Sequence, residues 1–265
     1  MLRLFDSHCH LDLPALADNW QQHWQQAQAV GVQACLLPAV SAAHWPKLLE
    51  LCQQPQFFAA LGVHPWWAAN AILDDLTTLE TLLAEKEEVC AVGEIGLDFA
   101  LDAATFSAQQ ALFSAQLAIA KRFEKPIILH HRKSQPQLLA ELKRQQFHYG
   151  GILHAFSGSY AQAKAFVDLG FKLGIGGTIT YERAHKTQNT VKKLPLDSLV
   201  LETDAPAMPL AGHQGQINTP AQLAEVFQCL LALRSESAQL LQEALWQNTL
   251  AALNLSKAVL GSDLG

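Results

Sequence analysis

The chain has 265 residues, close to the roughly 250 typical of a single (β/α)₈ barrel and long enough to bury a substantial core. Half of the residues are hydrophobic and 16% are charged, which excludes disordered and fibrous classes. The net charge of −6 excludes a general attraction for polyanions, so a nucleic-acid substrate would need local positive charge such as bound metal ions.

Eight short aliphatic runs alternate with longer amphipathic stretches along the whole chain. The runs cover residues 3–8, 34–40, 57–63, 90–95, 126–130, 151–156, 171–175 and 199–203. Most lack polar alternation, which indicates parallel strands covered on both faces. The pattern predicts an α/β protein, a (β/α)₈ TIM barrel. A Rossmann-like open sheet is the alternative, but the Gly-rich phosphate loop expected after its first strand is missing.

Helical periodicity fills the segments between these runs. It covers residues 20–30, 76–87, 106–123, 137–146 and 161–169, and a last helix is expected over 236–253. Thr219 and Pro220 resemble an N-cap followed by a first-turn proline, opening a helix that runs to about Arg234. Because there is no linker or short repeat, a single domain over 1–265 is expected, with 205–216 as an active-site loop.

Two histidines follow the first predicted strand, in the segment Asp6-Ser7-His8-Cys9-His10. In extended backbone, residues two apart point to the same side, so His8 and His10 are placed to share one ion. The alternative is a pair of histidines that only form local hydrogen bonds.

Glu94 lies at the end of the otherwise apolar fourth run. Burying an unpaired carboxylate is costly, so this position needs a cation. A metal is the simplest one, and a salt bridge to Arg or Lys is the alternative.

The same arrangement recurs where three later runs end, with His130, His154 and Asp204. Each residue alone is weak evidence, but in a barrel all strand ends meet at one face. Six ligand-type side chains are more than the four ligands of a tetrahedral structural zinc, so a two-metal or an octahedral site is expected. Register alone does not decide between His130 and His131.

Further groups flank this cluster. His64 follows the third run and is a candidate for substrate binding or catalysis, with a packing role equally open. Arg132 is a candidate phosphate ligand. Lys133 is better explained as a surface residue, and Trp66 and Trp67 either stack on a base or pack against loops.

Several motifs together resemble the TatD family, and the resemblance covers nearly the whole chain. They are Asp6-Ser7-His8-Cys9-His10-Leu11-Asp12, Gly93-Glu94-Ile95-Gly96-Leu97-Asp98, His130-x-Arg132, His154-x-Phe156-Ser157-Gly158 and Glu202-Thr203-Asp204-Ala205-Pro206. Segment 201–216 is most similar to the YjjV-type branch. The resemblance implies a metal-dependent hydrolase of the amidohydrolase superfamily, with deoxyribonuclease activity, often 3′–5′ exonucleolytic.

Position by position, the resemblance places six residues on the family's metal-binding pattern and favours His130 over His131. They are His8, His10, Glu94, His130, His154 and Asp204. The resulting hypothesis has two divalent ions, Zn²⁺, Mn²⁺ or Mg²⁺, lowering the pKa of a bound water, while Asp204 accepts its proton. Glu94 and His64 complete the catalytic set, and Arg132 and His64 hold the scissile phosphate of DNA.

Two other functions are compatible with the same residues. One is hydrolysis of a small amide, lactone or phosphoester, since the same chemistry serves all of them. The other is a barrel that binds metal without catalysis, although six ligand-type groups exceed what a structural site needs.

The five cysteines are widely spread and form no C-x-x-C pair, which favours a reducing compartment. The N-terminus shows no signal-peptide pattern, and no apolar run approaches a membrane span. A cytoplasmic protein with no membrane association and no obligate protein partner is expected.

Overall fold

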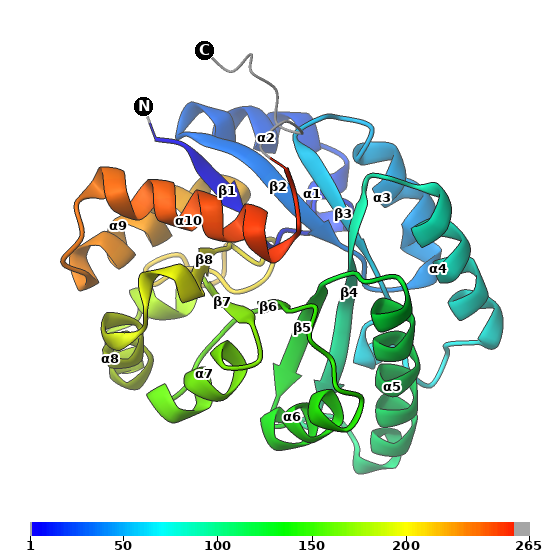
Figure 1. The fold of residues 1–265 in the computed structure, drawn as a ribbon. Helices are drawn as coiled ribbons and strands as arrows, with labels where there is room; N and C mark the ends of the chain where they lie inside the picture. The colour runs from blue at the N-terminus through cyan, green and yellow to red at the C-terminus, as the bar shows by residue number, and fades with distance from the viewer. Residues whose placement is uncertain (1, 257–265) are drawn as a thin grey trace.

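The computed structural model describes residues 2–256. Eight parallel strands are hydrogen-bonded in the order in which they occur in the chain. Figure 1 shows them as a ring with helices around the outside. The strands are β1 (Leu4–Asp6), β2 (Val32–Pro38), β3 (Phe57–Leu61), β4 (Val89–Asp98), β5 (Ile127–Arg132), β6 (Gly151–Leu153), β7 (Phe171–Ile175) and β8 (Leu199–Leu201). The predicted (β/α)₈ barrel is confirmed.

The barrel closes between β1 and β8, just beyond the ends of both strands. The backbone N–H of Ser7 donates to the carbonyl of Leu201 over 2.9 Å, and that of Asp204 donates to the carbonyl of His8 over 2.9 Å. Cys9 and Ala205 form a parallel bridge one step further on. An open sheet would leave these two edges apart, so the Rossmann-like alternative is wrong.

The predicted strand limits need correction in several places. β1 and β8 each end two residues before the predicted end, because the closing hydrogen bonds come from irregular backbone there and Asp204 has a positive φ of 58°. β2 begins and ends two residues early, and β6 ends at Leu153. β4 and β5 run longer than predicted, because they stay paired out to Asp98 and Arg132.

Ten α-helices are present in the described part of the chain. They are α1 (Pro14–Ala17), α2 (Trp20–Ala29), α3 (Trp45–Leu51), α4 (Leu73–Glu85), α5 (Phe106–Arg122), α6 (Gln135–Arg144), α7 (Tyr160–Val167), α8 (His185–Lys193), α9 (Leu223–Leu233) and α10 (Ala238–Ala252). Short 3₁₀ helices supplement them: η1 (Ala42–His44), η2 (Pro65–Trp67), η3 (Ala103–Thr105), η4 (Gly177–Thr180), η5 (Glu182–Ala184), η6 (Leu196–Ser198) and η7 (Pro220–Gln222).

The helices α1, α3 and α8 were not among those predicted. The first two are short, with four and seven residues. Among the nine residues of α8 only Val191 is aliphatic, so its sequence carries no apolar periodicity. The segment 205–216 contains no helix or regular strand, as expected for a loop.

Apolar side chains fill both the inside of the barrel and the layer between strands and helices. Inside, Phe5, Phe58 and Val200 pack with Trp246 and Leu250 of α10. This packing lies on the amino side of the residues at the strand ends, which leaves the carboxyl ends of the strands free to form a site.

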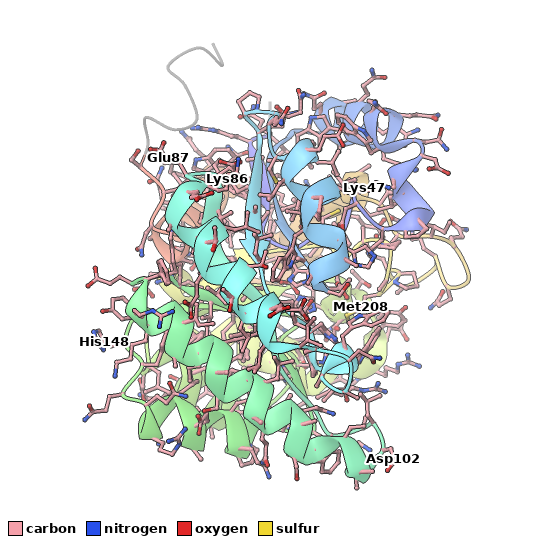
Figure 2. All side chains as sticks on the ribbon, turned by 90° about the vertical axis from the view of Figure 1, so that its right-hand side faces the viewer. Lys47, Lys86, Glu87, Asp102, His148 and Met208 are labelled. Carbon is pink, nitrogen blue, oxygen red and sulfur yellow. The ribbon has the colours of Figure 1, made fainter. Side chains whose placement is uncertain are left out.

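Charged side chains lie at the surface of the helical shell, such as the exposed Lys47 and Lys86, which Figure 2 labels. None of the helices in the described part of the chain combines the length and the apolar character that a membrane span needs.

Candidate metal centre

Glu94 on β4 lies at the centre of the site and is only 3% exposed. Gly96, two residues later, has φ of +145°, and a Cβ there would lie 2.1 Å from the carbonyl oxygen of His130. Only glycine permits this close approach of β4 and β5. The glycine therefore helps bring His130 next to Glu94.

The first half of the site combines His8 and His10 with Glu94 and Asp204. The Nε2 atoms of the two histidines lie 3.1 Å apart. His8 Nε2 is 3.2 Å from Glu94 Oε2, and both histidine Nε2 atoms are 3.6 Å from Asp204 Oδ1. Four ligand-type atoms therefore face one small volume, and both Glu94 and Asp204 reach it.

The second half of the site is formed by the other carboxylate oxygen of Glu94. His130 Nδ1 lies 2.8 Å and His64 Nε2 lies 3.4 Å from Glu94 Oε1. The rings of the two histidines meet edge to face with centroids 4.3 Å apart. His64 is thus buried inside the cluster, in contact with Glu94, and does not lie at its solvent-exposed edge.

His154 lies between the two halves. Its ring stacks on that of His8 with centroids 3.5 Å apart. Its Nε2 is 3.7 Å from Asp204 Oδ1 and 4.0 Å from Glu94 Oε1. The structure therefore brings all six predicted metal ligands and His64 into one cluster.

The backbone and two further carboxylates orient these histidines. His154 Nδ1 lies 3.1 Å from Glu202 Oε1, and His130 Nε2 lies 3.5 Å from Asp98 Oδ2. His10 Nδ1 lies 3.0 Å from the carbonyl oxygen of Pro38. Acceptors on the second ring nitrogen fix the tautomer and direction of a metal-binding imidazole.

Sequence reasoning missed the positioning roles of Asp98 and Glu202. Both lie within the quoted motifs, but nothing in their local pattern distinguishes them from carboxylates that turn outward. A signal for Glu202 is Gly174 on β7, where a Cβ would lie 2.0 Å from Glu202 Oε2. A glycine in a predicted central strand indicates such a close approach by another group.

His130 pairs with Glu94, whereas His131 makes no ion pair with any of the described residues. His131 Nδ1 lies 3.3 Å from Nε2 of Gln135 at the start of α6. Burial, followed by the charges of His130 and His154, lowers the pKa of His131 to about 3. The imidazole is therefore neutral at physiological pH.

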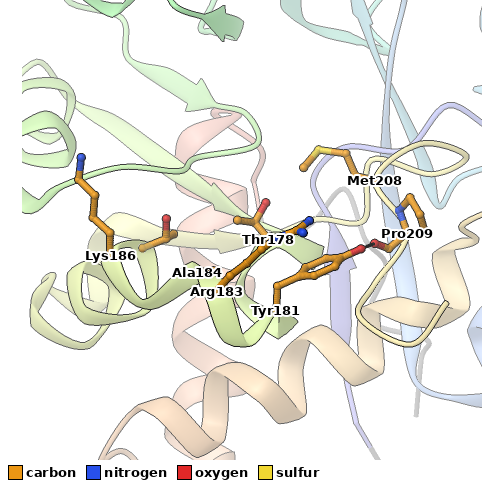
Figure 3. Close-up of a pocket in the computed structure, with 8 residues that line it drawn as sticks. Thr178, Tyr181, Arg183, Ala184, Lys186, Met208 and Pro209 are labelled. Carbon is orange, nitrogen blue, oxygen red and sulfur yellow. Dashed lines mark hydrogen bonds between the residues drawn. The ribbon is translucent and has the colours of Figure 1, made fainter. Parts of the chain in front are cut away.

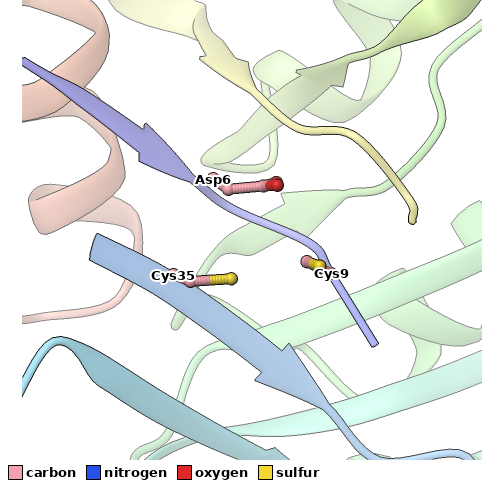
Figure 4. A group of neighbouring side chains, drawn as sticks. All are labelled: Asp6, Cys9 and Cys35. Atoms are coloured by element: carbon pink, nitrogen blue, oxygen red, sulfur yellow. The ribbon is translucent and has the colours of Figure 1, made fainter. Parts of the chain in front are cut away.

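The seam between β1 and β8 is held by Asp6, which is fully buried. It accepts hydrogen bonds from the backbone N–H of Thr203 over 2.9 Å and from the Thr203 hydroxyl over 2.6 Å. Figure 4 shows Asp6 beside Cys9 and Cys35. Because both oxygens of Asp6 already accept hydrogen bonds, we assign this cluster to barrel closure, which sets the positions of His8 and Asp204.

Ionisation of the central carboxylates is set by the histidines. Burial opposes the charge on Glu94, but His64, His8, His154 and His130 together lower its pKa well below the usual value. Burial likewise opposes the charge on Asp204, but neighbouring histidines, above all His154, outweigh this effect and lower its pKa. Both groups are therefore carboxylates at neutral pH, the form that binds cations.

His154 shows the complementary effect. Burial opposes its protonation, but the charges of Glu202, Asp204 and Glu94 raise its pKa to about 10. This surplus of negative charge around a buried imidazole is what a bound cation would neutralise.

The residues present fit a bound metal. All ion-pair partners of Glu94 within residues 2–256 are histidines: His8, His10, His64, His130 and His154. The salt bridge to Arg or Lys considered from sequence is therefore not formed in that part of the chain. Three groups in this cluster bring their ligand atoms within 4.8 Å of one another, namely His8, His10 and Asp204; His8, His154 and Glu202; and His64, Glu94 and His130.

Two pockets with basic side chains open near the strand ends. One, of about 420 Å³, includes Arg132, Lys133 and the start of α6. The other, also about 420 Å³, lies between η4, η5, α8 and the loop after β8, and includes Arg183 and Lys186 (Figure 3). Neither Lys133, Arg183 nor Lys186 forms an ion pair among the described residues.

The comparisons with known proteins match the chain over nearly its whole length. The family model described as TatD related DNase matches residues 5–254. The uncharacterized metal-dependent hydrolase YjjV of Escherichia coli (strain K12) is 44% identical over 96% of this chain and 98% of its own length. The crystal structure of E. coli YjjV, a TatD homolog, superposes with a TM-score of 0.93 over 96% of this chain and 99% of that chain.

A more distant relative carries a more specific name. The 3′-5′ ssDNA/RNA exonuclease TatD of Pantoea vagans (strain C9-1) is 30% identical over 96% of this chain and 100% of its own length. A matching family model over 5–254 and relatives of this identity and coverage lead to one conclusion. The chain belongs to the TatD family.

Proposed function

We propose that this chain is a divalent-metal-dependent hydrolase that cleaves phosphodiester bonds, with DNA as its substrate. The observation that carries the proposal is the Glu94 carboxylate enclosed by five imidazoles, with Asp204 beside them. The DNase description of the family model and the exonuclease name of the Pantoea relative support DNA, attacked from its 3′ end. The whole chain acts as one catalytic domain in the cytoplasm.

Two divalent ions would be held by the six ligands. His8, His10, Asp204 and Glu94 would hold one ion, and His130, His154 and Glu94 would hold the other. Mixed imidazole and carboxylate ligands suit Zn²⁺ or Mn²⁺ best, with Mg²⁺ the third candidate. Such ions, when bound, lower the pKa of a coordinated water and neutralise charge on phosphoryl oxygens.

The protein's own groups position the substrate and move the proton. Asp204 is a carboxylate at neutral pH, and its side chain is 13% exposed, so it is accessible to a water molecule. We assign it the role of accepting the proton of the attacking water. His64 and Arg132 would hold the scissile phosphate, since His64 Nε2 lies 3.4 Å from Glu94 Oε1 and Arg132 Nη1 lies 3.9 Å from Asp98 Oδ2.

Positive charge near the strand ends supports a polyanionic substrate. The chain as a whole has a net charge of −6, yet the two basic pockets contain Arg132, Lys133, Arg183 and Lys186. Arg is suited to bidentate contacts with phosphate, and Lys contributes a point charge. A neutral amide or lactone would not use these four cations.

The test is cleavage of end-labelled single-stranded DNA by the purified protein with added Mn²⁺, Mg²⁺ or Zn²⁺. We expect metal-dependent shortening from the 3′ end, abolished by a chelator and by His154→Ala. A panel of small amides, lactones and phosphoesters is assayed in parallel. Turnover of a panel member without DNA cleavage would replace the proposed substrate, and no turnover of any compound by metal-loaded protein would favour a non-catalytic barrel.

A further inference from the structure

Trp66 in η2 is exposed but fixed in position. The side chain is 60% exposed. Because burial of apolar surface stabilises a protein by about 25 cal/mol per Å², leaving this ring in solvent gives up part of that stabilisation. Its indole Nε1 donates to Asp98 Oδ2 over 2.8 Å, and its ring lies edge-on to His64 with centroids 4.8 Å apart. The backbone N–H of Trp66 also donates to His64 Nδ1 over 3.2 Å. An aromatic ring is thus held with an open surface beside the metal-ligand cluster.

Asp98 joins this ring to the phosphate-binding candidate Arg132. The Oδ2 atom that accepts from Trp66 also lies 3.9 Å from Arg132 Nη1 and 3.5 Å from His130 Nε2. Asp98 itself is fully buried, while the Arg132 side chain is 61% exposed. One buried oxygen therefore orients an exposed ring, an exposed guanidinium and an imidazole that faces Glu94.

We propose that Trp66 stacks on the base of the nucleotide whose phosphate Arg132 holds. An aromatic face beside a guanidinium matches a nucleotide, which presents a base and a phosphate a short distance apart. The inference rests on the proposed phosphodiesterase function and narrows it. The enzyme discriminates in favour of phosphodiesters that carry a base, and Trp66 is the residue that determines this specificity.

Trp66 has a matched neighbour that makes the idea testable. Trp67, in the same short helix, is 42% exposed but lines a different pocket, with Ala42, Asn70 and Ile72. Trp67→Ala therefore removes a comparable ring without touching Asp98 or His64. Trp66→Phe keeps an aromatic face and removes the indole N–H, which separates stacking from support of Asp98.

The experiment compares two oligonucleotides that differ only at the terminal residues flanking the scissile bond. One carries thymidines there, and the other carries abasic tetrahydrofuran residues. Stacking is worth about 1–3 kcal/mol per base, so wild type is expected to prefer the thymidine substrate in kcat/KM by roughly 5- to 150-fold. Trp66→Ala should lose the preference, while Trp66→Phe and Trp67→Ala should keep most of it.

Binding by calorimetry gives a readout that does not depend on turnover. Wild type should bind thymidine 5′-monophosphate more tightly than 2-deoxyribose 5-phosphate, and Trp66→Ala should bind both alike. Equal binding by wild type, or Trp66→Phe behaving as Trp66→Ala, would overturn the stacking role. Failure of the proposed function looks different, because neither oligonucleotide would then be cleaved whatever the binding shows.

Discussion

His154 Nδ1 lies 3.1 Å from Glu202 Oε1, and Glu202 also accepts a hydrogen bond from the backbone N–H of Ala155 over 2.6 Å. The carboxylate thus fixes both the ring and the backbone of a proposed metal ligand. We expect Glu202→Gln to lower metal affinity by about 10- to 100-fold, as is usual for such outer partners, with a parallel loss of activity. Metal titration by calorimetry measures the effect.

The matched control for this prediction is the partly exposed pair of His213 and Glu225, whose Nε2 and Oε2 atoms lie 3.2 Å apart. Glu225→Gln also breaks a histidine–carboxylate contact, but away from the cluster. If both variants bound metal as wild type does, Glu202 would have no positioning role.

A second prediction concerns proton transfer by Asp204. Asp204→Asn keeps the size of the side chain but removes its basicity, while the other five proposed ligands remain. General-base catalysis contributes typically about 10² to 10⁴-fold, so kcat should fall by that order with metal retained. The checks are single-turnover kinetics and metal content. Undiminished turnover would refute the assigned role.

A third prediction concerns Arg183 and Lys186, whose pocket lies beside Met208 (Figure 3). Replacing both with Ala should weaken cleavage of long oligonucleotides and flatten the salt dependence of kcat/KM. The slope of log kcat/KM against the logarithm of the salt concentration is expected to change by roughly 0.7 for each phosphate contact with single-stranded DNA that is lost. Replacing Lys192 and Lys193, in the last turn of the helix α8 that carries Lys186, is the control. If both double variants had the same effect, the pocket would have no specific role in DNA binding, and the effect would come from the net charge of the protein alone.

A fourth prediction concerns the pH dependence of stability through Glu141 on α6. Hydrogen bonds from Arg144 lower its pKa from the ordinary 4.5 to about 2. A carboxyl group whose pKa is lower in the folded than in the unfolded protein stabilises the folded state at pH values above its pKa in the unfolded protein. This contribution is lost as the pH falls from about 4.5 towards 2. Glu141→Gln should therefore destabilise at pH 7, with the difference from wild type narrowing below pH 4.5.

Urea unfolding at a series of pH values measures this difference. Glu87→Gln is the control, because Glu87 is exposed and forms no ion pair in the described part of the chain (Figure 2). A Glu141→Gln effect that stayed constant with pH would show that the carboxylate charge is not responsible.

The strand positions and the six proposed ligands could be read from the sequence because their signals are local. An aliphatic run that ends in His, Glu or Asp can be recognised from a few consecutive residues. The barrel topology then brings the carboxyl ends of all strands to one face. The polar helix α8 gave no such signal. The choice between His130 and His131 also depended on pairing with β4, where Gly96 stands opposite His130.

The positioning groups could not be assigned in this way. Asp98 depends on Trp66, which comes from a segment 32 positions away, and on the continued pairing of β4 with β5. Asp6 depends on Thr203, 197 positions further along the chain. These contacts exist only once the barrel has closed, so neither periodicity nor motif spacing predicts them.

The most direct test of the account is metal content by mass spectrometry after reconstitution with Zn²⁺ or Mn²⁺ and removal of free metal. The wild-type protein is expected to retain two equivalents and a variant with both His8→Ala and His10→Ala to retain at most one, with wild-type circular dichroism. Retention of the wild-type amount by that double variant, or of none by the wild type, would contradict a metal centre at the ends of these strands.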